Sequence, residues 1–130
     1  MPHPNEVLVR EANAALGRRE MDAFRNQYFA EDIRWHIPGR SPLAGDYEGV
    51  AQVLEYSGRV LELSGGTLVV ELRDVLANDE HVVTLFTIRA ERAGKHWEDS
   101  YVTVSRIRDG KLAEHWSYPG DQYAYDEFWS

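Results

Sequence analysis

The sequence predicts an α+β domain in which three helices pack on one face of a curved antiparallel sheet. Three observations lead to this fold class. Apolar residues recur at helical spacing near the start, a longer helical stripe occupies the middle, and alternating segments separated by turn residues fill the second half. The order of two helices, a strand, a helix and four meandering strands favours helices on one face of the sheet. At 130 residues, we expect a single domain over residues 1–130.

Two helices are expected before the first strand. The first one begins near Asn5, its predicted cap, and is broken at Gly17. The second is short and carries Met21, Phe24 and Tyr28 on one stripe.

The first strand and the longest helix flank a stiff connection. The segment DIRWHI alternates, so that His36 points away from the face that carries Ile33, Trp35 and Ile37. Residues 38–48 hold several glycines and prolines and are expected to form a rigid turn. From Gly49 a full apolar stripe predicts a helix that ends at the SGG sequence of residues 64–66.

Four strands are predicted in the remaining chain. TLVVELRDVLA is followed by the turn NDE, HVVTLFTIRAER by AGK, HWEDSYVTVSRI by RDG, and KLAEHWSY by Pro119. The aromatic tail DQYAYDEFWS either packs against the domain or a dimer mate, or forms a lid on an open end.

Composition limits the classes of function. The net charge of −8 argues against nucleic acid as a partner, and the absence of cysteine excludes thiolate chemistry. The five histidines sit on different elements without metal-ligand spacing, so we expect no metal and no cofactor. A small neutral or apolar ligand fits best. No stretch matches a signal peptide or a membrane span, which predicts a cytoplasmic protein without a membrane partner.

The element order, together with WHIPG, LAGDYEG, VLEYSGRVLELSGGT and DGKLAEHW, resembles the SnoaL-like branch of the nuclear transport factor two-like superfamily. The resemblance covers essentially the whole chain. That superfamily includes ketosteroid isomerase, polyketide cyclases, some epoxide hydrolases, dehydratases and non-catalytic members. The resemblance implies a cone-shaped half-barrel, usually a homodimer through the outer face of the sheet. It does not specify an activity, because this fold hosts many chemistries.

Two family comparisons narrow the chemistry. The three functional positions of ketosteroid isomerase fall on or near Ile37, Ala12 and Thr103, which cannot replace its groups, so steroid isomerisation is not expected. The polyketide cyclase branch often reads EHWD in the last strand, where this chain reads EHWS. His115 matches and Ser117 replaces the carboxylate; because a hydroxyl is too weak an acid, His115 would have to transfer the proton alone.

His115, Asp99 and Tyr56 are the candidate catalytic residues. The resemblance turns the face of His115 into the cone and leaves Leu112, Trp116 and Tyr118 for a dimer interface. Asp99 could orient His115 or act as a base, and Tyr56 could donate a hydroxyl. Each also has a structural interpretation: a hydrogen-bonded histidine, a solvated carboxylate and a buried tyrosine with its usual partner. The candidate substrate-binding residues are Trp35, Phe24, Phe86, Ile88, Tyr101, Thr103, Ser117 and, through a bulge at the strand end, His36.

Two classes of function follow. The first is a cofactor-independent enzyme that acts on a hydrophobic small molecule by general acid/base chemistry, as a cyclase, isomerase, dehydratase or epoxide-opening enzyme. The second is a non-catalytic module of the same fold that binds small molecules or dimerises. Convergence of His115, Asp99 and a tyrosine would favour the enzyme, and an apolar cone with a single histidine would favour the binding module.

Overall fold

The computed structural model describes residues 2–18, 20, 22 and 27–130. Of the predicted second helix, Met21 and Phe24 lie outside the described residues, whereas Tyr28 is described and buried. The described helices are α1 (Pro4–Gly17), α3 (Gly49–Leu63) and α4 (Gln122–Trp129). The strands are β1 (Phe29–Ile37), β2 (Gly45–Glu48), β3 (Val69–Ala77), β4 (His81–Arg92), β5 (Lys95–Arg108) and β6 (Lys111–Pro119).

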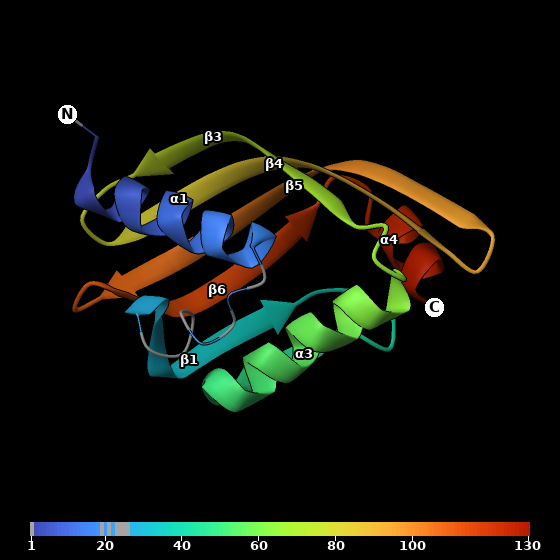
Figure 1. Ribbon diagram of the computed structural model, residues 1–130, viewed down its shortest axis with the longest axis horizontal. Helices are drawn as coiled ribbons and strands as arrows, with labels where there is room; N and C mark the ends of the chain where they lie inside the picture. Colours follow the sequence, from blue (N-terminus) through green and yellow to red (C-terminus); the bar gives the residue numbers. More distant parts are fainter. Residues whose placement is uncertain (1, 19, 21, 23–26) are drawn as a thin grey trace.

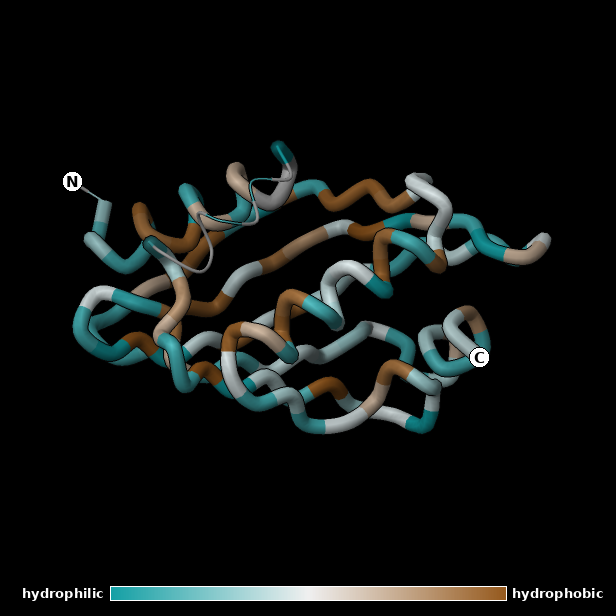
Figure 2. Tube along the Cα trace, turned by 60° about the horizontal axis from the view of Figure 1, so that its bottom comes forward, coloured by the Kyte–Doolittle hydropathy of each residue, from teal (hydrophilic) through white to brown (hydrophobic). Residues whose placement is uncertain are grey.

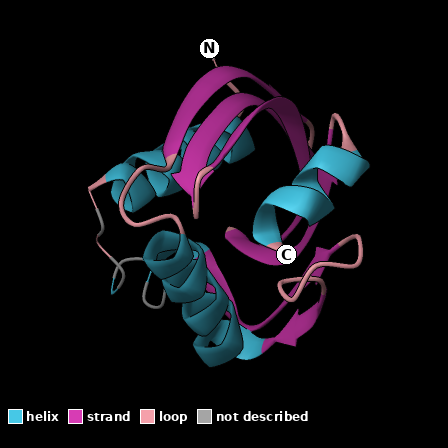
Figure 3. Cartoon of the chain, turned by 90° about the vertical axis from the view of Figure 1, so that its right-hand side faces the viewer, coloured by secondary structure: helices cyan, strands magenta, loops and turns pink. Residues whose placement is uncertain are grey.

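The six strands form one curved sheet in the order β2-β1-β6-β5-β4-β3 (Figure 1). Seen from the side, the sheet curls around an interior that the helices border (Figure 3). The predicted α+β fold with a curved, mostly antiparallel sheet is confirmed. One pair differs, because β1 runs parallel to β6. The chain between these two strands crosses the whole domain, and such a long crossover permits parallel pairing.

The four-residue strand β2 is a correction to the predicted rigid turn. It pairs antiparallel with β1, placing Trp35 opposite Tyr47 and His36 opposite Asp46. Four residues are too few for an alternating pattern to stand out in a segment rich in glycine and proline.

The C-terminal helix α4 was not predicted as a helix. Its N-cap is Asp121, whose side chain accepts a hydrogen bond from the backbone N–H of Ala124 at 3.1 Å. Tyr125, Phe128 and Trp129, at helical spacing, are each 2% exposed. A capping aspartate followed by apolar residues three and four apart is a helix signal. The tail therefore packs against the domain, which is one of the two arrangements expected from the sequence.

A β-bulge corrects the assignment of faces in β6. Arg106 pairs with Glu114 but Ile107 pairs with Leu112, so Ala113 is an extra residue in the ladder. An extra residue reverses the alternation of side chains. Leu112 therefore lies in the core, 5% exposed, and does not belong to the outer face on which the sequence placed it.

The start of α1 also differs from the prediction. Asn5 lies inside the helix, and its side-chain amide donates to the carbonyls of Asn78 and Asp79 in the β3–β4 turn. The imidazole of His3 accepts the Asn5 N–H. Asn5 thus ties α1 to the sheet instead of capping it.

The core consists of two clusters on either side of a partly buried Trp35. One lies between α1, α3 and the sheet and includes Ile33 and Val53; the other is aromatic and includes Trp97 and the buried residues of α4. Hydrophobic residues recur along the strands and helices, whereas the turns are mostly hydrophilic (Figure 2). Among the helices described, none is both long and apolar enough to cross a membrane.

Candidate functional site

A cavity of about 500 Å³ opens between α1, α3 and the inner face of the sheet. This volume is in the range of small-molecule sites. Its lining combines predicted and unpredicted residues. The predicted ones are Trp35, Tyr56, Phe86, Ile88, Tyr101, Thr103, His115 and Ser117. The sequence did not single out Arg10, Asn13, Ala14, Ser57, Val60, Leu61, Leu68, Val70 and Leu72.

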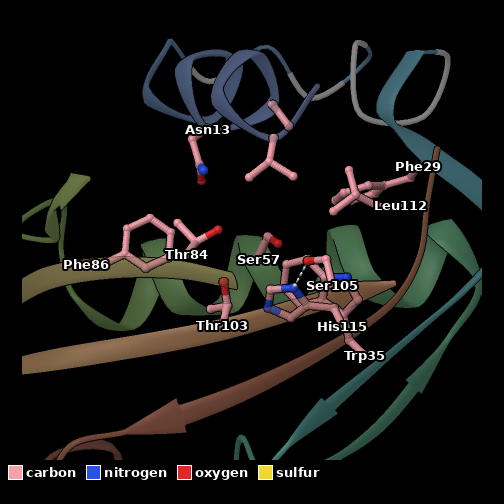
Figure 4. A pocket seen from close by; sticks show the side chains of 12 residues that line it. Asn13, Phe29, Trp35, Ser57, Thr84, Phe86, Thr103, Ser105, Leu112 and His115 are labelled. Atoms are coloured by element: carbon pink, nitrogen blue, oxygen red, sulfur yellow. Dashed lines mark hydrogen bonds between the residues drawn. The ribbon is translucent and has the colours of Figure 1, made fainter. Parts of the chain in front are cut away.

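An inner recess of about 80 Å³ shares part of this lining and extends it toward α1. Figure 4 shows Asn13 reaching into the recess from α1, with Phe86, Thr103 and His115 below it. Thr84 and Ser105 add two further hydroxyl groups. Strand alternation could have identified both hydroxyls, because they share the inner faces of their strands with Phe86 and Thr103. Asn13 and Arg10 lie on α1, where only the packing of the helix decides which side meets the cavity.

His115 lies at the junction of the cavity and its recess. Its ring stacks on that of Trp35, with centroids 4.3 Å apart and planes inclined by 25°. The Ser105 hydroxyl lies 3.2 Å from Nδ1, and the Ser117 hydroxyl lies 3.4 Å from Nε2. A neutral imidazole has one donor and one acceptor nitrogen, so one serine donates to the ring and the other accepts from it.

Burial lowers the pKa of His115 to about 3, and the nearby His36 adds a smaller repulsion between positive charges. The ring is therefore neutral at physiological pH. The sequence offered Asp99 as the group that could orient His115. The structure instead places the two serine hydroxyls at both ring nitrogens.

Asp99 lies on β5, closer to the start of that strand than Ser105, and it is not among the residues that line the cavity. On β5 it pairs with Ile88, whereas Ser105 is the residue opposite His115. Its carboxylate accepts the backbone N–H of Asp121 at 3.0 Å. A Cβ on Gly120 would approach Asp99 Oδ1 to 2.5 Å, so glycine is needed for this close turn. Asp99 thus anchors the connection between β6 and α4.

His36 lies on the opposite face of the sheet from His115. Its Nδ1 is 2.8 Å from Asp46 and its Nε2 is 2.6 Å from Glu114, while its ring stacks on Trp116. Desolvation opposes protonation, but the hydrogen bonds that His36 donates to the carboxylates of Asp46 and Glu114, together with their negative charges, outweigh it and raise the pKa of His36. No bulge turns this residue inward. The prediction that it could bind substrate is therefore wrong, as strand alternation itself indicates.

Tyr56 and Tyr101 bring hydroxyl groups to the cavity from α3 and β5. Burial raises the pKa of both, and the nearby Tyr125 of α4 adds a smaller upward contribution. All these hydroxyls stay protonated, so they remain hydrogen-bond donors at physiological pH.

The cavity is almost uncharged. Of its lining residues, only Arg10 carries a charge, and Arg10 Nε lies 3.1 Å from Glu6. Within the described residues no cluster of histidine, cysteine or acidic side chains is arranged to hold a metal ion. The site offers an apolar surface, several hydroxyls and one neutral imidazole. Such a site favours an uncharged molecule with oxygen substituents.

Comparison with known proteins agrees with this architecture. The family model of the SnoaL-like domain matches residues 9–115. An uncharacterised protein of Mycobacterium tuberculosis is 33% identical over 124 residues, which are 95% of this chain and 94% of that protein.

Two solved structures extend the comparison. Bal32a, from a soil-derived mobile gene cassette, superposes with a TM-score of 0.93 at 33% identity, covering 98% of this chain and 97% of its own. An NTF2-like protein of Burkholderia xenovorans shares the fold, with a TM-score of 0.84, 24% identity and coverages of 98% and 96%. The chain therefore belongs to the SnoaL-like family.

Proposed function

We propose that this protein binds a small, uncharged and largely apolar molecule in the cavity and transfers a proton on it through His115. The observation that carries the proposal is a neutral imidazole held in place by Trp35, Ser105 and Ser117 at the wall of an almost uncharged cavity. A histidine required only for packing would not need to face a cavity of this size.

The low pKa of His115 determines in which protonation state the residue begins the reaction. Because the pKa of His115 is about 3, holding the imidazolium at pH 7 costs roughly 5 kcal/mol. His115 must therefore begin the reaction as a base or as a neutral donor. In the proposed step, one ring nitrogen takes a proton from a carbon next to a substrate carbonyl and leaves an enolate. The negative charge of the enolate then stabilises the imidazolium until the same proton is returned to another atom.

The serines complete this scheme by orienting the ring. Ser117 makes the longer contact, at 3.4 Å, and it lines the main cavity, so substrate can take its place at Nε2. Ser105, at 3.2 Å from Nδ1, fixes the opposite nitrogen from the recess. Return of the proton to a different atom would give isomerisation. Attack of the enolate carbon on a second carbonyl would give cyclisation.

A non-catalytic binding module remains the second candidate, and a specific observation favours it. Asp99 does not contribute to the cavity, so the convergence of a carboxylate with His115 that the sequence proposed for catalysis is not met. A neutral histidine with two serine partners can also serve as a hydrogen-bonding point for a ligand that is bound unchanged.

Deuterium exchange on a simple ketone separates the two candidates. 2-Tetralone is a flat, uncharged, mostly apolar ketone whose α-protons exchange with D₂O when a base removes them. We expect the native protein to accelerate this exchange at least about 10²-fold over His115→Gln, the usual contribution of a general base. His96→Gln, at a mostly exposed site, should behave like the native protein. Binding of 2-tetralone without any acceleration would contradict catalysis and favour the binding module.

The homodimer is part of the same proposal. On the outer face, Val83, Val104 and Trp116 form one row across three strands, and Leu85, Val102 and Tyr118 form the next. Tyr118 is 51% exposed in the single chain. A sheet that is apolar on both faces is typical of an interface, which supports a second copy of this chain as the partner. We retain the cytoplasmic location as a prediction from the sequence.

A further inference from the structure

His36 lies on the outer face of the sheet with one carboxylate at each nitrogen of its ring. Its Nδ1 is 2.8 Å from Asp46 of β2, and its Nε2 is 2.6 Å from Glu114 of β6. An ionised carboxylate only accepts hydrogen bonds, so each of these contacts needs a proton on the ring. The geometry therefore identifies His36 as an imidazolium. The proposed function does not use this charge.

This imidazolium joins three strands. His36 belongs to β1, and its two carboxylates come from the strands on either side in the order β2-β1-β6. β2 has four residues and lies at the edge of the described sheet, paired with β1 alone. The contact between His36 and Asp46 is thus a side-chain attachment for a strand whose backbone ladder is short.

The remaining charged groups around His36 act through Glu114. Arg106 of β5 places its Nε 3.4 Å from Glu114 Oε1, and Arg34 of β1 adds a further attraction to the same carboxylate. The side chain of Glu114 is 16% exposed, whereas that of Asp46 is 70% exposed. Glu114 therefore keeps positively charged neighbours when His36 is neutral, and Asp46 can turn into water.

Contacts of Tyr47 connect β2 to the cavity. Tyr47 lies opposite Trp35 in the pairing of β2 with β1, and its ring centroid lies 4.8 Å from that of Tyr56. Trp35 and Tyr56 both line the cavity. Movement of β2 would therefore change the support behind two residues of the cavity wall.

We propose that His36, with Asp46 and Glu114, forms a pH-sensitive clasp that holds β2 on the sheet while the ring carries both protons. A neutral imidazole has one N–H donor, so it can hold only one of the two carboxylates. The Nδ1 proton leaves to solvent, Nε2–H stays with the less exposed Glu114, and Asp46 is released. β2 then loosens and, through Tyr47, weakens binding in the cavity. The effect on binding rests on the proposed function, whereas the clasp itself does not.

The two carboxylates set the direction of the pH dependence. Desolvation lowers the pKa of His36, but the hydrogen bonds and charges of Asp46 and Glu114 outweigh it and raise that pKa above its ordinary value of 6.5. The folded chain thus holds this proton more tightly than the unfolded chain. The stabilisation by the clasp is fully present just below pH 6.5 and is lost as the pH rises through the raised pKa.

Hydrogen exchange of the β2 backbone amides tests the clasp. We correct their protection for the intrinsic exchange rate at each pH. In the native protein we expect this protection to fall roughly threefold as His36 loses its proton, the scale of one exposed ion pair. Nuclear magnetic resonance of ¹⁵N-labelled histidine follows the titration of His36 in the same samples. Protection that stays constant while His36 titrates would overturn the clasp.

Asp46→Asn should abolish the pH dependence and leave β2 attached. The amide oxygen of asparagine can accept from the charged ring, and the amide N–H can donate to Nδ1 of the neutral ring. The protection of β2 should then not vary with pH, and the pKa of His36 should lie below its native value.

Asp79→Asn is the matched control, because Asp79 makes the same kind of pair with His3 at 2.8 Å. This variant should keep the native pH dependence of β2. A native dependence in Asp46→Asn, or its loss in Asp79→Asn, would overturn the assignment to His36.

Ligand binding provides a second readout. His115, with a pKa of about 3, does not titrate in this range. The dissociation constant of 2-tetralone, measured by quenching of tryptophan fluorescence, should rise roughly threefold over the same range in the native protein and stay constant in Asp46→Asn. A constant value in the native protein while β2 loosens would overturn the link to the cavity. If the native protein binds no 2-tetralone at any pH, the proposed function fails, and hydrogen exchange still decides whether the clasp exists.

Discussion

At the scale of single residues, His115 is the side chain to which the proposed function assigns the chemistry of the cavity. Its chemistry is set by its neighbours, since burial against Trp35 keeps it neutral and two serines fix its orientation. Strand alternation and family resemblance singled out this histidine and slightly less than half of the residues that line the cavity. The hydrogen-bond partners of His115 could not be predicted in the same way. The register between neighbouring strands decides that Ser105, and not Asp99, lies opposite His115.

The depressed pKa of His115 predicts acid sensitivity. Between pH 6.5 and about 3 the unfolded chain binds a proton at this residue and the folded chain does not. The free energy of unfolding should therefore fall as the pH drops, by up to about 1.4 kcal/mol per pH unit. His115→Phe, which retains an aromatic ring against Trp35, should show a shallower dependence in urea titrations across this range. Identical slopes for the two proteins would contradict a neutral imidazole at this position.

At the scale of elements, α4 depends on the turn that precedes it. Asp99 and Asp121 both hold this turn, the first by accepting the Asp121 N–H and the second by capping the helix. We expect Asp99→Ala to lower the free energy of unfolding by about 1 kcal/mol without changing the affinity for 2-tetralone. Glu98→Ala, at a neighbouring exposed carboxylate, should change stability little. A large loss of catalysed exchange in a folded Asp99→Ala protein would restore Asp99 as a catalytic candidate.

The length of a helix or strand determines whether its sequence pattern predicts it. The apolar stripe of α3 and the alternation of β3 to β6 predict these elements because each is long enough to repeat its pattern. β2 has four residues, and the direction of β1 against β6 depends on the whole domain. The bulge at Ala113 shows why inner and outer faces need the structure, because one extra residue moved Leu112 to the core.

At the scale of the whole molecule, the outer face of the sheet should hold two copies of the chain together. Sedimentation is expected to give about twice the 14.9 kDa of one chain at micromolar concentration. Val104→Glu, which places a charge in the centre of the apolar rows, should give a monomer. Tyr123→Glu is the control on α4, away from these rows, where Tyr123 is 90% exposed. A native monomer would contradict this assembly.

The most direct test of the central claim is nuclear magnetic resonance of ¹⁵N-labelled histidine in the native protein between pH 3 and 8, with and without 2-tetralone. The protein has five histidines, and we expect one of them, absent from His115→Gln spectra, to remain a single neutral tautomer down to about pH 3 to 4. Its ring nitrogens should shift when 2-tetralone binds, because the ligand takes the place of Ser117. Titration of His115 near pH 6.5, together with no response to the ligand, would contradict the account.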